Sequence, residues 1–271
     1  KALFGQIEAV DTLQEITGNE TSSRLWLQDA IVIDDFVYLF PLLVKDESTA
    51  FYVASVNVIK APIVDGLIDY KNATYLSSPL YIKTPSGGDL YFGAGILDNR
   101  DIDGYIYIYG YLDLDGRKLT VARTTAENIS NFNEWLFYNG TSFSDNPLDS
   151  APFLDSVSPE LSVTYMTSGI YQGKYMLVAM EGTTSGRVSY SVGESPVGPF
   201  SEFHLLYETS ESEDLKSAFT YNAKMHPILS TPEAFLISYN VNTTSISALG
   251  NTEIYYPRFI IVTEVKAPKG E

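Results

Sequence analysis

Short apolar segments separated by clusters of Gly, Asp, Asn, Ser and Pro run through the whole chain. Apolar runs of roughly five to eight residues between such clusters predict β-strands. A turn followed by an aromatic-rich strand occurs four times, at residues 34–40, 103–110, 172–180 and 231–239. Further apolar segments flank these four, at residues 30–33, 51–56, 90–97, 119–123, 161–165, 187–192 and 258–265. Helix is predicted only as single turns near residues 125–129 and 211–218.

The strands repeat at a nearly constant interval. Equivalent positions in the four segments lie 69, 69 and 60 residues apart, at Tyr38, Tyr107, Met176 and Leu236. A four-stranded unit that recurs at a fixed period is typical of a β-propeller blade. A β-sandwich with coincidental spacing is the alternative. No linker or low-complexity segment divides the chain, so the sequence predicts a single all-β domain over residues 1–271.

The charge of the chain narrows the choice of partners. Asp and Glu outnumber Lys and Arg by 34 to 17, which gives a net charge of −17. Binding to nucleic acid needs clustered basic residues, and an anionic membrane repels an acidic protein. The apolar run at residues 36–44 contains Pro41 and is far shorter than the ~20 residues of a membrane helix. We therefore expect a monomer with no nucleic-acid partner and no membrane insertion.

Metal and redox chemistry have little support in the composition. The chain has no Cys and two His, which excludes disulfides and thiolate ligands and disfavours a zinc site. A structural calcium ion at a propeller channel is compatible with the many carboxylates, and no other cofactor is expected. Residues 113–116 lack the full spacing of a calcium loop and predict a hairpin turn instead. Lys1–Gln6 lack the apolar core of a signal peptide.

Several sequence segments resemble known families. Residues 188–200, which end in Ser195-Pro196-Val197-Gly198-Pro199-Phe200, resemble the five-bladed propeller glycosidases, notably glycoside hydrolase family 43. Residues 103–110, 121–123, 131–135, 221–227 and 236–242 are similar to the bacterial family called domain of unknown function 4185. The resemblance implies a five-bladed β-propeller, of which four blade units are clear here and one is uncertain. It also implies a secreted, periplasmic or cell-surface bacterial protein that acts on carbohydrate.

One departure from these families bears on activity. In those families the opening blade usually contains motifs similar to G-T-D-L-G and F-G-D-T, which include acidic residues. Neither motif is present in this sequence. Residues 1–28 could supply only part of a fifth blade. Two functions therefore stay open: a glycoside hydrolase, or a non-catalytic carbohydrate-binding or scaffold propeller.

The candidate catalytic residues are acids at the ends of predicted inner strands. Glycoside hydrolysis needs two carboxyl groups, one protonated and one ionised, on either side of the scissile bond. Glu160 or Glu181 would be the acid, and Asp29 or Asp98 would be the base or the group that tunes the acid. For each of them the alternative is a solvated loop acid or a turn cap.

The candidate substrate-binding residues are aromatic or polar side chains near these acids. Trp26 and Tyr221 would stack on sugar rings, Asn240 would bind hydroxyls, and Arg100 would lie in the cleft. His226 would lie near the channel. The alternatives are packing in the core for the aromatic side chains and a hydrogen bond to nearby backbone for His226.

Overall fold

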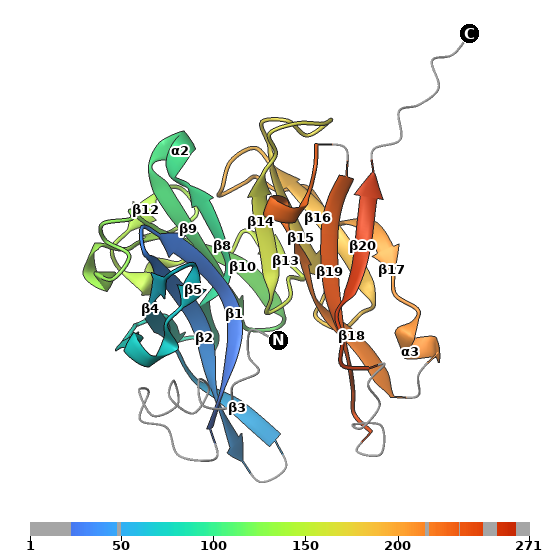
Figure 1. Cartoon of the computed structure of the whole chain (residues 1–271), viewed down its shortest axis with the longest axis horizontal. Helices are drawn as coiled ribbons and strands as arrows, with labels where there is room; N and C mark the ends of the chain where they lie inside the picture. Colours follow the sequence, from blue (N-terminus) through green and yellow to red (C-terminus); the bar gives the residue numbers. More distant parts are fainter. Residues whose placement is uncertain (1–22, 48–49, 215–216, 233, 246–253, 264–271) are drawn as a thin grey trace. The chain divides into compact units, whose positions relative to one another are not determined.

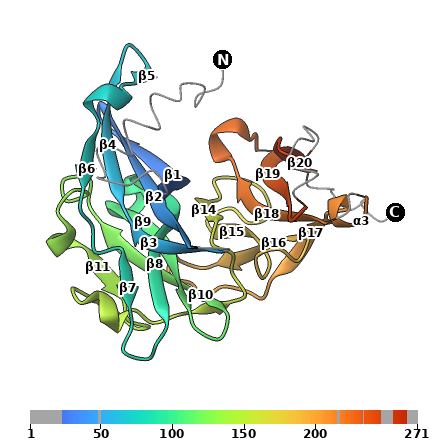
Figure 2. The same ribbon diagram turned by 90° about the horizontal axis from the view of Figure 1, so that it is seen from below.

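The computed structural model describes residues 23–47, 50–214, 217–232, 234–245 and 254–263. The chain divides into two compact units. One contains residues 1–114 and 120–151, and the other contains residues 115–119 and 152–271. Figure 1 shows the elements in sequence colours, and Figure 2 shows them from below. Four antiparallel sheets account for the strands in the described residues.

The first sheet has the strand order β1-β2-β4-β5, in which β1 is Ser23–Ile33, β2 is Phe36–Glu47, β4 is Val58–Val64 and β5 is Leu67–Ile68. Two further strands join it: β3 (Ala50–Val56) pairs with β2, and β6 (Thr74–Leu76) pairs with β4. The strands β1, β2 and β4 lie side by side in Figure 2. Only Asp34 and Asp35 separate β1 from β2, and Asp34 has a φ of 52°. Asp tolerates this left-handed conformation, which matches the tight turn of a hairpin. The turn at residues 34–40 is therefore a β-hairpin, as predicted.

The second sheet runs β12-β11-β10-β9-β8-β7. Its strands are β7 (Tyr81–Lys83), β8 (Asp89–Asn99), β9 (Tyr105–Asp113), β10 (Arg117–Thr124), β11 (Leu136–Tyr138) and β12 (Phe143–Ser144). The short helix α2 (Arg100–Asp103) joins β8 to β9 and ends at Gly104, whose φ is 84°. A turn with Asp115 at a φ of 53° and Gly116 at 99° joins β9 to β10, which confirms the hairpin predicted for residues 113–116.

Two sheets form most of the second unit. The third runs β14 (Leu161–Tyr165), β15 (Tyr175–Met180), β16 (Arg187–Gly193), β17 (His204–Glu208), and the fourth runs β18 (Ala218–Met225), β19 (Ala234–Thr243), β20 (Arg258–Thr263). Strand β13 (Leu154–Asp155) pairs with Lys118 and Leu119, the part of β10 that belongs to this unit. The helix α3 (Glu211–Asp214) fulfils the turn predicted near residues 211–218. Residues 125–129 form the single hydrogen-bonded turn predicted there, without a regular helix.

Each unit has its own buried apolar cluster. In the first sheet, Val37, Leu39, Ile59 and Ala61 pack together. In the second unit, alternate residues of β15 and β19, such as Val178, Met180 and Ile237, form a larger cluster between the third and fourth sheets. Burying one such side chain contributes about 1.5–3 kcal/mol. Successive side chains of a strand point to opposite faces of the sheet, so every second residue enters these cores.

The predicted fold class is confirmed. The protein is all-β and is built of consecutive antiparallel sheets, and the third sheet is a four-stranded meander of the kind found in propeller blades.

Candidate functional site

Asp29 is held inside the first sheet by backbone hydrogen bonds. A bulge between Leu27 and Asp29 interrupts the pairing of β1 with β2. The Asp29 carboxylate accepts hydrogen bonds from the Ala30 amide at 2.9 Å and the Ile96 amide at 2.7 Å. It therefore stands at the start of the segment 30–33 and joins β1 to β8.

Asp98, near the end of β8, forms a bidentate ion pair with Arg100. Arg100 Nη2 lies 2.6 Å from Asp98 Oδ2, and Arg100 Nε lies 2.8 Å from Oδ1. The Arg100 hydrogen bonds hold the pKa of Asp98 below its ordinary range, although partial burial opposes this. Arg100 Nη2 also reaches the Val32 carbonyl at 3.4 Å. Asp98 is thus kept ionised, with both oxygens engaged.

Asp29 and Asp98 are held by different partners near the end of β8. Asp29 accepts from the Ile96 amide, two residues before Asp98, whereas Asp98 is paired with Arg100, which contacts Val32 near the end of β1.

Trp26 is accessible for ligand contact. Its side chain is 40% exposed, and its ring meets the Phe51 ring edge-on at 4.8 Å between centroids. This pair extends over β1 and β3 of the first sheet. The core-packing alternative does not describe Trp26, whereas Trp135 is fully buried and donates its indole N–H to the Asn128 carbonyl.

Glu160 directly precedes β14 in the second unit. Burial raises the pKa of its carboxyl, and the positive charges of Lys224 and Arg117 oppose the rise. A carboxyl that keeps its proton above the ordinary range suits a general acid.

Tyr221 and Asn240 lie together with Glu160. Tyr221 pairs with Asn240 across β18 and β19, just before a bulge in β18. Its hydroxyl hydrogen-bonds to the side chains of Asn240 and Asn242. Burial raises the pKa of Tyr221, and the charge of Glu160 adds to the rise. The structure thus joins Glu160, Tyr221 and Asn240 in one polar cluster.

His226 follows β18 and contacts a neighbouring strand. Its Nε2 lies 2.7 Å from the Ser238 hydroxyl, and its backbone amide donates to the Leu236 carbonyl at 2.9 Å. Its ring is therefore hydrogen-bonded to a side chain on β19.

Glu181 directly follows β15 and lies at the same end of the third sheet as Glu160. Leu161 pairs with Ala179, so side-chain alternation puts Glu160 and Glu181 on opposite faces. The Glu181 carboxylate accepts from Arg187 Nε and from the Ser189 hydroxyl, each at 3.2 Å. The two glutamates therefore do not form a catalytic pair.

Sequence reasoning missed the cations around Glu160. Arg117 and Lys224 are the charges that act on its carboxyl, and they come from segments more than a hundred residues apart in the chain. No local motif marks them. Asn242 lies two residues after Asn240 on β19, and its side chain hydrogen-bonds to the Tyr221 hydroxyl.

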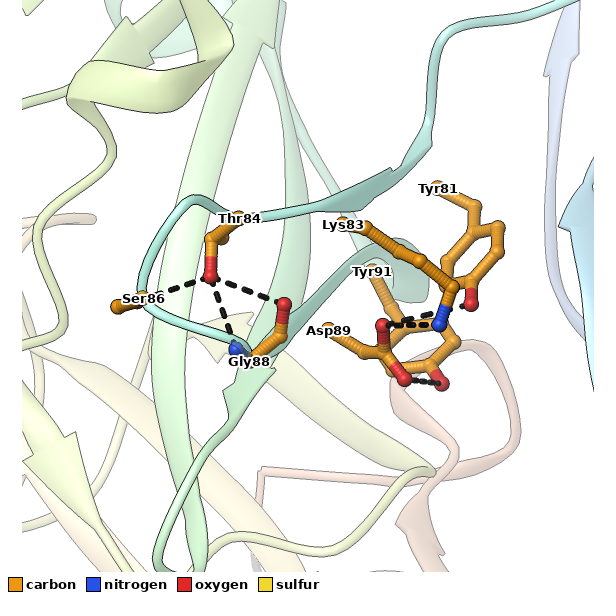
Figure 3. A network of polar contacts seen from close by, with 7 residues as sticks. All are labelled: Tyr81, Lys83, Thr84, Ser86, Gly88, Asp89 and Tyr91. Carbon is orange, nitrogen blue, oxygen red and sulfur yellow. Dashed lines mark hydrogen bonds and ion pairs between the residues drawn. The ribbon is translucent and has the colours of Figure 1, made fainter.

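A second polar network lies in the β7–β8 hairpin (Figure 3). Lys83 Nζ lies 3.1 Å from Asp89 Oδ1, and the Tyr81 and Tyr91 hydroxyls approach the same carboxylate at 3.4 and 3.5 Å. The Thr84 hydroxyl accepts from the Gly88 amide at 3.0 Å. These contacts close the hairpin between β7 and β8.

Two further properties concern only the residues that the structure describes. Within them, no group of three or more His, Asp and Glu side chains is arranged to hold a metal ion. Within the same ranges, no helix is long and apolar enough to cross a membrane.

The sheets define a class, an all-β fold of antiparallel sheets of the kind found in propeller blades. Residues 6–265 match the family model described as domain of unknown function (DUF5005), and the chain belongs to that family. The family named from the sequence, domain of unknown function 4185, is a different one. No curated protein matches the chain.

Solved structures are similar to the chain at low identity. A protein from Bacteroides ovatus described as a "putative hydrolase" has 17% identity and a TM-score of 0.63, with 91% of this chain and 63% of that chain covered. The chain thus spans less than two thirds of that relative. A thermostable family-43 glycoside hydrolase has 14% identity and a TM-score of 0.49, with 92% and 75% covered. An exo-β-1,3-galactanase from Phanerochaete chrysosporium, solved with β-1,3-galactotriose, has 14% identity and a TM-score of 0.48, with 84% and 48% covered.

Proposed function

We propose that the protein is a glycoside hydrolase that acts on a polysaccharide or oligosaccharide, with Glu160 as the proton donor. The observation that carries the proposal is the raised pKa of Glu160, caused by burial. Burial favours the protonated form of a carboxyl, and a protonated carboxyl can protonate the leaving oxygen of a glycosidic bond. The fold similarity to a hydrolase supports this class.

The surroundings of Glu160 suit a sugar. Tyr221 offers a partly buried ring, and the amides of Asn240 and Asn242 lie at its hydroxyl. Amides can donate to and accept from sugar hydroxyls, and an aromatic face packs on the apolar face of a sugar. These side chains would orient the substrate, while Lys224 and Arg117 limit the rise in the Glu160 pKa.

Glu160 is preferred to Glu181 as the acid because Arg187 and Ser189 already occupy the Glu181 carboxylate. The partner carboxylates that the sequence predicts, Asp29 and Asp98, belong to the first unit, whereas Glu160 belongs to the second. Each of these carboxylates accepts hydrogen bonds from the protein, Asp29 from the Ala30 and Ile96 amides and Asp98 from Arg100.

The test is sugar release from arabinan, xylan and β-1,3-galactan by the purified protein. Glu160→Gln should lower the rate by about 10²–10⁴-fold, the usual contribution of general acid catalysis. An aryl glycoside with a good leaving group needs less protonation and should lose less. Glu134→Gln, an exposed glutamate elsewhere, is the matched control. An unchanged rate for Glu160→Gln would contradict the assignment.

The second candidate is a non-catalytic carbohydrate-binding or scaffold protein. Two observations favour it. Asp29 and Asp98 already make structural hydrogen bonds, and the chain lacks the acidic motifs that the related families carry in their opening blade. Binding of these glycans without any release of sugar would support it.

We also propose that the protein is monomeric and works outside the cytoplasm of a bacterium, because polysaccharide substrates are extracellular. Light scattering and fractionation of the producing cells test these two points.

A further inference from the structure

A cavity of about 690 Å³ lies in the second unit, away from the cluster around Glu160. Its walls include Phe153, Leu154, Phe203, Glu181, Glu202 and Lys118. The volume falls within the ~300–1,000 Å³ typical of small-ligand sites. Glu181 was a catalytic candidate from the sequence, and the structure gives it a separate environment.

One wall of this cavity is held rigidly. The Phe153 amide donates to the Leu119 carbonyl at 3.0 Å, and the Gly182 amide donates to the Ser156 carbonyl at 2.8 Å. The Phe153 ring also stacks on Phe200, with 6.0 Å between centroids. The segment that forms this wall is therefore tied to β10 on one side and to the β15–β16 turn on the other. A pre-formed wall lowers the entropy that a ligand loses on binding.

The cavity is distinct from the proposed catalytic cluster. Glu181 faces the side of the third sheet opposite to Glu160, because Leu161 pairs with Ala179. Arg187 and Ser189 fix the Glu181 carboxylate on that face. A ligand in this cavity would therefore not contact Glu160.

The lining selects the chemistry of the ligand. Glu181, Glu202 and Asp155 present carboxylates, whereas Lys118 is the cation of the lining. An anionic ligand would be repelled by the carboxylates of the lining. A wholly apolar ligand would displace water from these carboxylates without offering them hydrogen bonds in return. Lys118, together with Arg187 bound to Glu181, offsets part of the negative charge. The best match is a neutral molecule with many hydroxyl donors and an apolar face for Phe153 and Phe203.

We infer that this cavity is a second carbohydrate-binding site, for a neutral oligosaccharide, separate from the Glu160 cluster. The choice of a sugar rests on the proposed function, whereas the cavity and its separation from Glu160 do not. Such a site would hold a polymer chain close to the enzyme.

The experiment is amide-detected NMR titration of the full chain with xylotetraose, arabinotetraose and β-1,3-galactotriose as probes, and with spermidine as a cationic probe. We expect shifts at Leu154, Ser156 and Phe203 with at least one of the sugars. Phe203→Ala and Glu202→Gln should each weaken that binding by about tenfold, as loss of a central contact does. Glu134→Gln should leave it unchanged, and thermal melts confirm that each variant is folded.

The outcomes separate the two proposals. Glu160→Gln should lose hydrolysis and keep the shifts at the cavity. If the wild type releases no sugar but the cavity shifts persist, the proposed function fails and the second site stands. Absence of cavity shifts with all three sugars, a response to spermidine alone, or binding that survives both cavity substitutions would overturn the second site.

Discussion

Glu160 and Glu181 stand at the same end of the third sheet, and their side chains point to opposite faces of it. The pairing of Leu161 with Ala179 produces this arrangement. On one face, burial raises the pKa of Glu160. On the other, Arg187 and Ser189 bind the Glu181 carboxylate beside an open cavity. Two acids that look alike in the sequence therefore have different chemistry.

The raised pKa of Glu160 makes stability depend on pH. The Glu160 carboxyl binds its proton more tightly in the folded protein than in the unfolded chain. The free energy of unfolding therefore falls as pH rises from the ordinary pKa of Glu, which applies to the unfolded chain, through the raised pKa of the folded protein. Glu160→Gln removes the charge and should raise Tm by a few degrees at pH 8, with no difference at pH 4. Thermal melts across this range measure the effect. An equal shift at both pH values would contradict the burial of this carboxyl.

Asp29→Asn should destabilise the first unit. The Asp29 carboxylate accepts from two backbone amides, at Ala30 and Ile96, and an amide has only one acceptor oxygen. The loss should be about 1–3 kcal/mol, the range for hydrogen bonds to a charged group. Urea unfolding followed by the fluorescence of buried Trp135 measures it, with the exposed Asp35→Asn as control. Equal stability of the two variants would show that these bonds contribute little.

Arg100→Gln should have a small effect that depends on pH. The side chains of Arg100 and Asp98 are 32% and 45% exposed, and ion pairs this exposed contribute about 0–1 kcal/mol. The Arg100 hydrogen bonds lower the pKa of Asp98 in the folded state, so their contribution is present above the ordinary Asp value and is lost as pH falls through the lowered one. Unfolding of both proteins at pH 7 and at pH 2.5 checks this. A difference that persists unchanged in acid would point to the contact with the Val32 carbonyl instead.

Gly110→Ala should be severely destabilising. A Cβ at Gly110 would overlap the Tyr91 carbonyl on the adjacent strand β8, and backbone cannot move aside as a flexible side chain can. We expect a loss of more than about 3 kcal/mol, or failure to fold. Gly104→Ala is the matched control, since its φ is 84° but no atom lies within 4 Å of the new Cβ. That substitution should cost about 1 kcal/mol, and soluble yield with urea unfolding distinguishes the two.

Much of the strand layout could be predicted because it depends on local patterns. Alternating apolar residues between turn formers identified β2, β9, β15 and β19, and residues such as Asp34 and Gly116 adopt the positive φ that tight turns need. Residues 125–129 form a hydrogen-bonded turn that does not continue into a regular helix. Local composition does not distinguish a single turn from the start of a helix.

The sequence by itself determined the strands, the hairpin turns and the position of Glu160 at the start of an inner strand, because side-chain alternation and turn chemistry act over a few neighbouring residues. It could not decide which acids share surroundings. Only the tertiary structure brought Arg117 and Lys224 to Glu160, put Glu181 on the opposite face and tied Asp98 to Arg100. Those outcomes depend on strand register and on contacts between distant segments, and charge and burial at each carboxyl follow from them.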